Sequence, residues 1–309
     1  MTDTAFPEPR AGAPETAAAA TTPTTTDPLA LAAARGTVTQ WSSAFVGIRD
    51  AGRAIGAGPL TLGRLVVAAA VLGAIVAVRR EARPPRADLP RLVAFALLWF
   101  GAYNVMLNAA EHRVDAGTAA MLVNVGPVFI ALLAGLVLRE GFPRALLGGC
   151  AVAFAGAVVI GAATSERGVS AGAGAALCIA AALAYAGGVV AQKPLLERTS
   201  GLQVTFLGCT VAAIACLPYA PGLVRDVRAA GAGPVAWAVY LGAFPTALGF
   251  TTWAYALRRT TAGRMAATTY LVPPLAVVMG WLFPGETPPA LALAGGALCL
   301  AGVVLARRR

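Results

Sequence analysis

The sequence predicts an all-α membrane protein of ten transmembrane helices, arranged as two inverted five-helix repeats. Three observations carry this prediction. The chain has 309 residues, of which 58% are hydrophobic and only 12% are charged, whereas about 25% are charged in an ordinary soluble domain. Long uncharged stretches recur along the chain. The two halves also repeat each other at a fixed spacing, so one membrane unit is present twice.

Uncharged stretches of 19 to 29 residues predict most of the helices, because each can cross about 30 Å of hydrocarbon. There are eight of them: 92–110, 116–138, 145–165, 168–192, 199–224, 229–257, 265–285 and 287–306. Two further spans, 30–49 and 58–78, contain Arg35 and Arg64 respectively. A long arginine side chain can reach the membrane interface from such a position. The total is therefore ten helices.

The duplication is read from an ungapped register. A shift of 146 residues lays Gly263–Glu286 over Gly117–Glu140, and Pro127 then falls on Pro273. The register continues on both sides of these segments. Five helices per unit is an odd number, so we expect the second unit to enter the membrane from the opposite side. Inverted repeats of this kind are typical of alternating-access transporters.

The repeats divide the chain into three parts. Residues 1–28 are rich in Ala, Thr and Pro, which predicts a disordered N-terminal tail. This tail lacks the basic start and apolar run of a signal peptide. Residues 29–164 form the first predicted repeat and residues 165–309 the second.

Basic residues between the spans predict the orientation. With the N-terminus in the cytoplasm, sixteen Lys and Arg residues fall in inside segments and six in outside segments. By the positive-inside rule, both termini are expected in the cytoplasm, and the protein in the inner (cytoplasmic) membrane. This topogenic pattern also accounts for the net charge of +10, so we expect the lipid bilayer as a partner and no nucleic acid.

Short motifs follow one another in a characteristic order. In the first half they are QWSSAFVGIR (40–49), PLTLGR (59–64), LNAAEHRVDAG (107–117), LRE (138–140) and GGCAVAFAGAVVIG (148–161). In the second half they are YALRRTTAG (255–263), PGE (284–286) and GGALCLAGVVL (295–305). The ordered set resembles the EamA-type transporters of the drug/metabolite transporter superfamily. Ser42 stands where that family commonly has Gly, and Arg139 where Gly before Glu140 is usual.

The resemblance covers about residues 30–306 and implies both a fold and an activity. It implies a ten-helix bundle of two inverted repeats around a central cavity, lined mainly by helices 1, 3, 4, 6, 8 and 9. It implies a secondary transporter that moves small metabolites, amino acids or drugs by alternating access. We expect this transporter to be an exporter. The resemblance leaves open the substrate, the choice between import and export, the coupling ion and the choice between a monomer and a homodimer.

Polar and aromatic residues at membrane depth are the candidates for the substrate cavity. An unpaired amide or hydroxyl is costly in hydrocarbon, so these side chains should face the bundle interior. The candidates are Trp41, Tyr103, Asn104, Asn108, Asn124, Tyr185, Trp253 and Tyr270. Asn124 and Tyr270 are equivalent under the 146-residue shift, which favours a site between the repeats. The alternative for any of them is an interhelical hydrogen bond without substrate contact.

Prolines inside apolar spans are candidates for helix kinks or gates: Pro127, Pro245, Pro273 and Pro274. Proline removes a helical hydrogen bond and frees a carbonyl group, which then needs a partner or a water-filled cavity. These kinks either flank the translocation path or only improve helix packing. The symmetric placement of Pro127 and Pro273 favours a shared role in a rocking movement of the two repeats.

The remaining charged residues have structural interpretations. Glu140 and Glu286 end two proline helices and are expected to cap the helices that follow. Arg64 is expected to snorkel or to bind a backbone carbonyl rather than a substrate anion. His112 lies in a loop turn, where a role in pH sensing is the less favoured interpretation.

Two other function classes are the alternatives to a transporter. An intramembrane enzyme would need paired aspartates, a G-x-S-x-G serine or an H-E-x-x-H helix at membrane depth. We identify none there and predict no catalytic residue, metal site or cofactor. A non-transporting membrane scaffold is the other alternative. It would have a dry, apolar bundle centre, whereas a transporter would gather polar residues at one central cavity.

Overall fold

A computed structural model describes residues 28–137, 144–165, 169–259, 269–283, 285 and 287–306. These residues contain helices and turns but no strand. The predicted tail lies outside the described residues except for Pro28, the first residue of α1. Glu140 and Glu286, the two predicted caps, also lie outside them.

The first half of the chain begins with two long helices, α1 (Pro28–Ala51) and α2 (Ala57–Arg79). The next span joins a short 3-10 turn, η1, to α3, a π-helical segment η2 and α4. Their bounds are Arg86–Asp88, Leu89–Phe95, Ala96–Ala102 and Tyr103–Glu111. The half ends with α5, α6 and α7, whose bounds are Ala116–Val123, Gly126–Val137 and Arg144–Ser165.

The second half follows the same order. It begins with α8 (Val169–Arg198) and α9 (Gly201–Ala215), followed by a 3-10 turn η3 and α10 (Leu217–Tyr219 and Ala220–Ala229). The π-helical segment η4 lies between α11 and α12; the three bounds are Ala232–Leu241, Gly242–Leu248 and Gly249–Arg259. A 3-10 turn η5, α14 and α15 complete it, with bounds Thr269–Leu271, Val272–Leu282 and Ala290–Ala306.

Helix boundaries repeat at the spacing found in the sequence. The π-helical segments begin at Ala96 and Gly242, which are 146 positions apart. The same 146 positions separate Gly126, the first residue of α6, from Val272, the first residue of α14. Helices α7 and α15 start at that spacing too. The duplication is therefore present in the secondary structure as well as in the sequence.

Four described helices are long and apolar enough to cross a membrane, or up to five if one bent pair counts as a span. The four are Ala57–Arg79, Arg86–Glu111, Ser170–Arg198 and Ala232–Leu257. Shorter apolar helices cover Ala116–Ile130, Ala151–Ile160, Val272–Leu282 and Ala290–Gly302. The chain is thus an all-helical, multi-pass membrane protein in the described residues, while the number ten remains a prediction.

Two predicted spans are interrupted. The span predicted over 116–138 turns at Asn124 and Val125, between α5 and α6. The span predicted over 199–224 bends by 56° at Cys216, between α9 and the segment Leu217–Ala229. A proline stands at the start of each new segment, Pro127 in α6 and Pro218 in η3. Proline is tolerated in the first turn of a helix, where its missing N–H would have no helical partner.

Side-chain caps fix two helix starts. Asp115 Oδ1 accepts a hydrogen bond from the backbone N–H of Thr118, 2.8 Å away, at the start of α5. Ser200 Oγ accepts one from the N–H of Gln203, 3.1 Å away, at the start of α9. Such caps satisfy backbone donors that the helix itself leaves without an acceptor.

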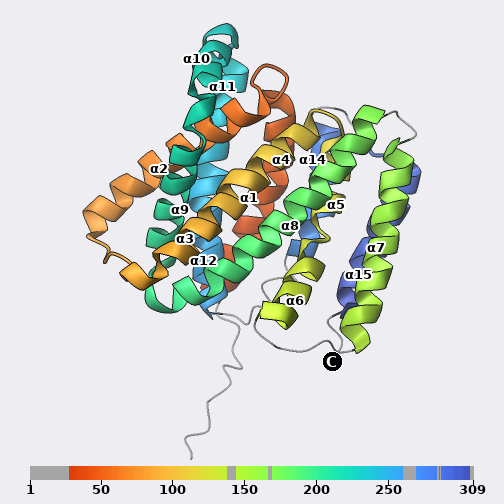
Figure 1. Cartoon of the computed structure of the whole chain (residues 1–309). Coiled ribbons are helices and arrows are strands. Elements are labelled where there is room, and N and C mark those ends of the chain that lie inside the picture. The colour runs from red at the N-terminus through yellow and green to blue at the C-terminus, as the bar shows by residue number, and fades with distance from the viewer. Residues whose placement is uncertain are drawn as a thin grey trace, which may run out of the picture.

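Equivalent helices pack together at both edges of the bundle. Helices α7 and α15 lie side by side at one edge, and α2 packs against α9 on the other side (Figure 1). Glycines allow the first of these contacts. A Cβ atom on Gly156 would lie 2.6 Å from the backbone N of Cys299 and 2.6 Å from the carbonyl oxygen of Gly295. This close packing of the two helices is made within one chain.

Helix α1 runs through the middle of the bundle, where it contacts α4 and α5 of the first half and α11, α12 and α14 of the second. Ser42, at the position where the family commonly has Gly, donates a hydrogen bond from Oγ to the carbonyl oxygen of Val272, 3.3 Å away. This bond ties α1 to the start of α14. The face of α1 that carries Trp41 and Phe45 is thereby held toward the centre.

Candidate functional site

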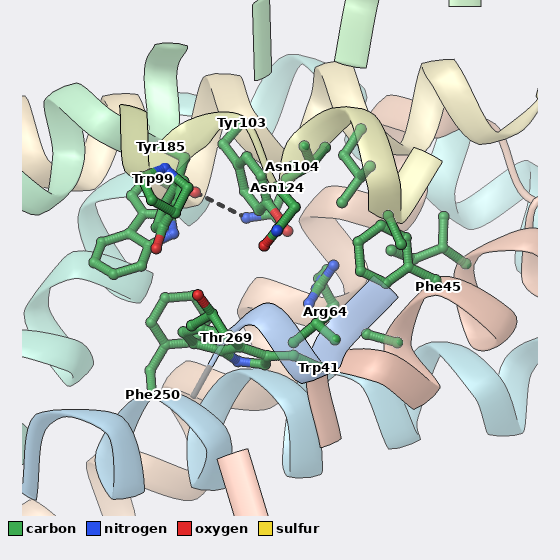
Figure 2. Close-up of a pocket in the computed structure, with 17 residues that line it drawn as sticks. Trp41, Phe45, Arg64, Trp99, Tyr103, Asn104, Asn124, Tyr185, Phe250 and Thr269 are labelled. Atoms are coloured by element: carbon green, nitrogen blue, oxygen red, sulfur yellow. Dashed lines mark hydrogen bonds between the residues drawn. The ribbon is translucent and has the colours of Figure 1, made fainter. Parts of the chain in front are cut away.

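A cavity of about 70 Å³ lies in the interior of the bundle (Figure 2). Its lining comes from both halves of the chain. The lining residues are Trp41, Ala44, Phe45, Ile48, Arg64, Trp99, Tyr103, Asn104, Leu107, Ala120, Val123, Asn124, Pro127, Tyr185, Phe250, Thr269 and Val272. The cavity is mostly apolar with a few polar groups, as small-molecule sites usually are.

One wall of the cavity is aromatic. The rings of Trp99 and Tyr185 lie 5.1 Å apart between centroids, and those of Trp99 and Phe250 lie 5.0 Å apart. Trp41 completes this wall, with its ring centroid 5.2 Å from that of Phe250. Its Nε1 donates a hydrogen bond to the carbonyl oxygen of Pro245, 3.3 Å away. Ring pairs at these separations attract one another and keep the wall rigid.

Polar groups gather on the other side of the cavity. Asn104 donates from Nδ2 to the carbonyl oxygens of Trp99 and Phe100, 3.1 and 2.9 Å away, both in the π-helical segment η2. Asn124 stands at the break between α5 and α6 and points into the cavity (Figure 2). Its side chain is only 7% exposed, and its Nδ2 has no hydrogen-bond acceptor among the described residues.

Arg64 brings a charge into the cavity from α2. Its side chain is 4% exposed. Nε and a terminal nitrogen both donate to the hydroxyl of Thr246 in η4, at 3.1 and 2.9 Å. The sequence interpretation expected snorkelling or a bond to a backbone carbonyl. The structure instead pairs Arg64 with Thr246, a residue of the second half. The Thr246 hydroxyl in turn donates a hydrogen bond to the carbonyl oxygen of Leu241, 2.8 Å away.

Five of the eight predicted cavity residues lie together at this site: Trp41, Tyr103, Asn104, Asn124 and Tyr185. Asn108 does not line the cavity. It donates to Thr61 Oγ1 and to the carbonyl oxygen of Ala57, at 2.8 and 3.2 Å, so it makes the interhelical hydrogen bonds of the alternative interpretation.

Trp253 and Tyr270 are the other two predicted residues. Trp253 packs behind Trp41, with ring centroids 5.0 Å apart, and is 3% exposed. Its Nε1 has no hydrogen-bond partner among the described atoms. Tyr270 is in the 3-10 turn η5, and its side chain lies outside what the structure describes.

The four predicted kink prolines occupy two kinds of position. Pro127 lines the cavity and is the second residue of α6, so it begins a helix rather than bending one. Pro273 and Pro274 likewise lie in the first turn of α14. Pro245 is inside the π-helical segment η4, where its carbonyl oxygen accepts the Trp41 hydrogen bond. Of these four prolines, only Pro245 is therefore in the middle of a continuous described helix.

The sequence interpretation missed Trp99, Phe250 and Phe45, because an aromatic residue in an apolar span resembles ordinary core. The repeat register carried a usable signal for one of them. Phe250 is 146 positions after Asn104, and both line the cavity. Val123 and Thr269 form a second such pair around the same cavity. The cavity thus draws on matching positions of the two repeats.

Contacts at the predicted outer ends also join separate elements. Arg49 of α1 donates from its guanidinium to the carbonyl oxygen of Glu111 at the end of α4. His112 follows directly, and its pKa lies below the ordinary value of 6.5 because of burial and the nearby positive charges of Arg113 and Arg49. At neutral pH this imidazole is therefore uncharged, which agrees with a structural role.

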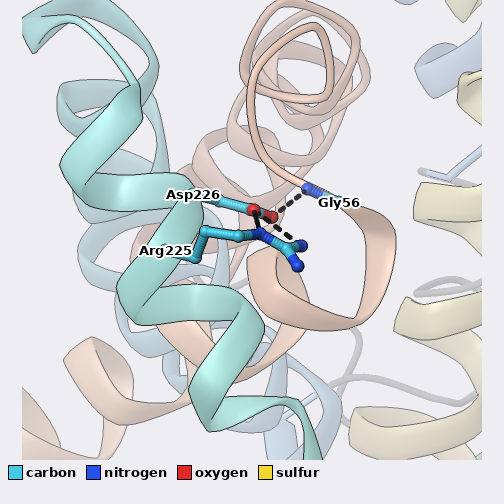
Figure 3. Close-up of polar contacts among 3 residues, drawn as sticks. All are labelled: Gly56, Arg225 and Asp226. Atoms are coloured by element: carbon cyan, nitrogen blue, oxygen red, sulfur yellow. Dashed lines mark hydrogen bonds and ion pairs between the residues drawn. The ribbon is translucent and has the colours of Figure 1, made fainter.

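A second outer contact links the halves. Asp226 of α10 accepts a hydrogen bond through Oδ2 from the backbone N–H of Gly56, 3.0 Å away, and its Oδ1 lies 3.0 Å from a terminal nitrogen of Arg225 (Figure 3). Gly56 is the N-cap residue of α2. A carboxylate is stabilised at this end of a helix by the backbone N–H groups and the helix dipole.

The described residues offer little for other chemistry. Among them, no group of three or more His, Cys, Asp or Glu side chains could hold a metal ion. A G-x-S-x-G pattern does occur at residues 168–172, but Ser170 is exposed in the first turn of α8. A hydrolase nucleophile of this type is held on a turn between a strand and a helix.

The chain thus has the helices of a polytopic membrane protein and a cavity lined by both halves. The model of the EamA-like transporter family matches residues 28–162 and again residues 172–308. The chain belongs to the EamA-like transporter family, with two copies of its domain. Because this is a family of transporters, the protein is a transporter and not an enzyme.

Several curated relatives are similar along most of their length. A protein of Streptantibioticus cattleyicolor, named as a probable terminal-alkyne amino-acid exporter, is 41% identical over 88% of this chain and 91% of its own. A probable amino-acid metabolite efflux pump of Salmonella typhimurium is 27% identical over 72% of this chain and 77% of its own. A solved crystal structure covering 91% of this chain and 98% of its own has a TM-score of 0.63 at 18% identity, which shows a shared fold.

Proposed function

We propose that this transporter exports small amino-acid-like metabolites across the cytoplasmic membrane by alternating access. The observation that carries the proposal is the cavity, where side chains from both halves converge deep in the bundle. The relative at 41% identity is named as an amino-acid exporter, which supports both the substrate class and the direction. A non-transporting scaffold would have no reason to gather Arg64, Asn104 and Asn124 at one internal site.

The architecture proposed for this activity is ten helices in two inverted repeats, with both termini in the cytoplasm. Matching helix starts at a spacing of 146 residues and the pairing of α7 with α15 support it. Beyond the four long apolar helices and the bent pair, the remaining five spans are proposed over 30–49, 116–138, 145–165, 265–285 and 287–306. A monomer or a homodimer is compatible with it, and a homodimer would use a face other than the α7–α15 contact.

Alternating access also agrees with the size of the cavity. Its volume of about 70 Å³ is well below the ~300 Å³ at which ligand pockets usually begin. The substrate site therefore needs to widen, which rocking of the halves would accomplish. The proposed substrate contacts are Trp41, Tyr103, Asn104, Asn124 and Tyr185, together with Tyr270 by its equivalence to Asn124.

Transport by purified protein in proteoliposomes tests this proposal. The substrates are a panel of radiolabelled amino acids that includes L-propargylglycine, measured with and without a pH gradient. Wild-type protein is expected to move at least one member, and Asn124→Ala and Tyr270→Phe are expected to lower the rate per folded molecule at least about tenfold. Asn108→Ala is the matched control, because Asn108 lies outside the cavity lining and its loss should alter stability only.

Two results would contradict the proposal. Failure of the folded wild-type protein to move any member of the panel would reject the proposed activity. Equal rates for Asn124→Ala, Tyr270→Phe and Asn108→Ala would reject the assignment of the site while leaving transport in place.

A further inference from the structure

We infer that Arg64 and Asn124 form a carboxylate-binding subsite, so that the transported molecule carries a free carboxylate beside an apolar group. This inference rests on the proposed transport function and adds the chemical group that the site recognises. It reverses the expectation from the sequence alone, in which Arg64 was structural.

The charge balance of the cavity is the first argument. Arg64 is the one charged residue among the seventeen described residues that line it. Its hydrogen bonds within the described chain all go to a single neutral hydroxyl, that of Thr246. The buried carboxylate of Glu111 acts on the Arg64 charge from outside the lining, without an ion pair between the two side chains. A buried charge without a directly bound counter-ion is costly, and a bound anion would relieve that cost.

The second argument is the direction of the unused donors. With Nε and one terminal nitrogen of Arg64 bonded to Thr246, the other terminal nitrogen has no acceptor among the described residues. The Nδ2 of Asn124, also without an acceptor there, enters the same cavity from the break between α5 and α6. Figure 2 shows both side chains pointing into the cavity. Two convergent N–H donors, one of them charged, suit the two oxygens of a carboxylate.

The opposite wall defines the rest of the molecule. Trp41, Trp99, Phe250 and Tyr185 present ring surfaces that would cover an apolar side chain. A phosphate would carry up to two charges, while the lining offers a single cation and mostly apolar surface. A monocarboxylate with a short apolar group is therefore the better match to this pocket than a phosphorylated metabolite.

Binding at Arg64 would also touch the contact between the halves. Arg64 belongs to α2 of the first half, and Thr246 to η4 of the second. A carboxylate held by the free terminal nitrogen and by Asn124 leaves both hydrogen bonds to Thr246 in place. The substrate would thus bind directly beside a contact that joins the two halves.

The test compares acids with their amides. Binding of L-propargylglycine, L-leucine and L-phenylalanine, each beside its primary amide, is measured by calorimetry on purified protein, and uptake of the three acids is measured in proteoliposomes. Wild-type protein should bind the acids at least about tenfold more tightly than the amides, and Arg64→Gln should weaken acid binding about ten- to hundredfold. Amide binding should change little. Asn124→Ala should weaken acid binding in the same direction.

Matched variants separate recognition from folding. Arg64→Lys keeps the positive charge and should retain the preference for acids, although with lower affinity because lysine lacks the planar fork. Arg53→Gln removes an exposed arginine that pairs with Asp50 and should behave as wild type. If Arg64→Gln does not fold, the test rests on whether the wild type and Arg64→Lys bind the acids more tightly than the amides.

The outcomes distinguish the two hypotheses. Uptake of the acids together with equal binding of acids and amides would overturn the carboxylate subsite and leave the transport function standing. Unchanged acid affinity in folded Arg64→Gln would overturn it as well. A folded wild-type protein that takes up none of the acids would contradict the proposed function, and the subsite with it.

Discussion

The thiol of Cys299 in α15 donates a hydrogen bond to the carbonyl oxygen of Ala153 in α7, 3.2 Å away, and the two residues are 146 positions apart. They are therefore equivalent residues of the two repeats in direct contact. Such a contact is expected where a two-fold axis passes between two copies, because each residue near the axis meets its own counterpart. The contact supports the inverted arrangement that we propose.

Close approach of α7 and α15 makes Gly156 intolerant of a side chain. A Cβ atom at Gly156 would lie 2.6 Å from backbone atoms of Cys299 and Gly295, so Gly156→Ala should force the helices apart and destabilise the protein by about 1–3 kcal/mol. Thermal unfolding in detergent checks this. Gly148→Ala is the control on the same helix, since its Cβ would meet nothing within 4 Å. Equal melting temperatures for the two variants would contradict the prediction.

Thr246 is expected to be important for stability because it is the acceptor for the buried guanidinium of Arg64. Thr246→Val keeps the shape but leaves Arg64 without that acceptor, which should cost about 1.5–3 kcal/mol. Thr251→Val is the matched control, because the Thr251 hydroxyl donates only to the carbonyl oxygen of Ala247, 2.6 Å away in the same chain segment. Unfolding midpoints in detergent decide between them, and a stable Thr246→Val protein would reject the role of this bond.

The surroundings of Asp226 predict that the stability of the folded protein depends on pH. The hydrogen bond from the N–H of Gly56, aided by Arg225, holds the pKa of Asp226 below the ordinary value of 3.8. The folded protein thus binds this proton less readily than the unfolded chain. The contribution to stability is present above pH 3.8 and is lost as the pH falls through the lower pKa of the folded state.

Melting temperatures of wild type and Asp226→Asn at a series of pH values measure this contribution. The wild type should be the more stable at neutral pH, and the difference should shrink progressively below pH 3.8. Asp50→Asn, which removes an exposed ion pair to Arg53, should change little at neutral pH. A difference between wild type and Asp226→Asn that stays constant down to acid unfolding would refute the prediction.

The sequence was informative wherever the repeat register could be applied. The shift of 146 residues predicted that Pro127 and Pro273 are equivalent, and the structure places each of them in the first turn of a helix, α6 or α14. It also placed Asn124 at a special position, which the structure shows to be the break between α5 and α6. Composition alone identified the membrane environment, since hydrocarbon excludes charge over whole spans.

Long-range pairing could not be predicted. Asn104 and Asn108 share a helix face and were equal candidates, yet only Asn104 lines the cavity, because Thr61 happens to lie beside Asn108. The sequence interpretation placed Arg64 at the membrane interface. Its partner Thr246 is 182 positions away in the chain, so the sequence did not reveal the pairing. The prolines were expected to kink continuous helices. They more often begin new ones, since a turn before the proline removes the conflict that a kink would relieve.

The paired π-helical turns have a mechanical consequence. Each inserts one residue beyond the α-helical repeat at the level of the cavity, in η2 and again in η4. Rewinding one of them to α-helix would swivel the segment beyond it by about 100° and shift it by about 1.5 Å along its axis. In η2 that segment carries Asn104; in η4 it carries Phe250. Each repeat therefore contains, next to the pocket, a one-residue insertion that could change the position of a pocket residue by rewinding.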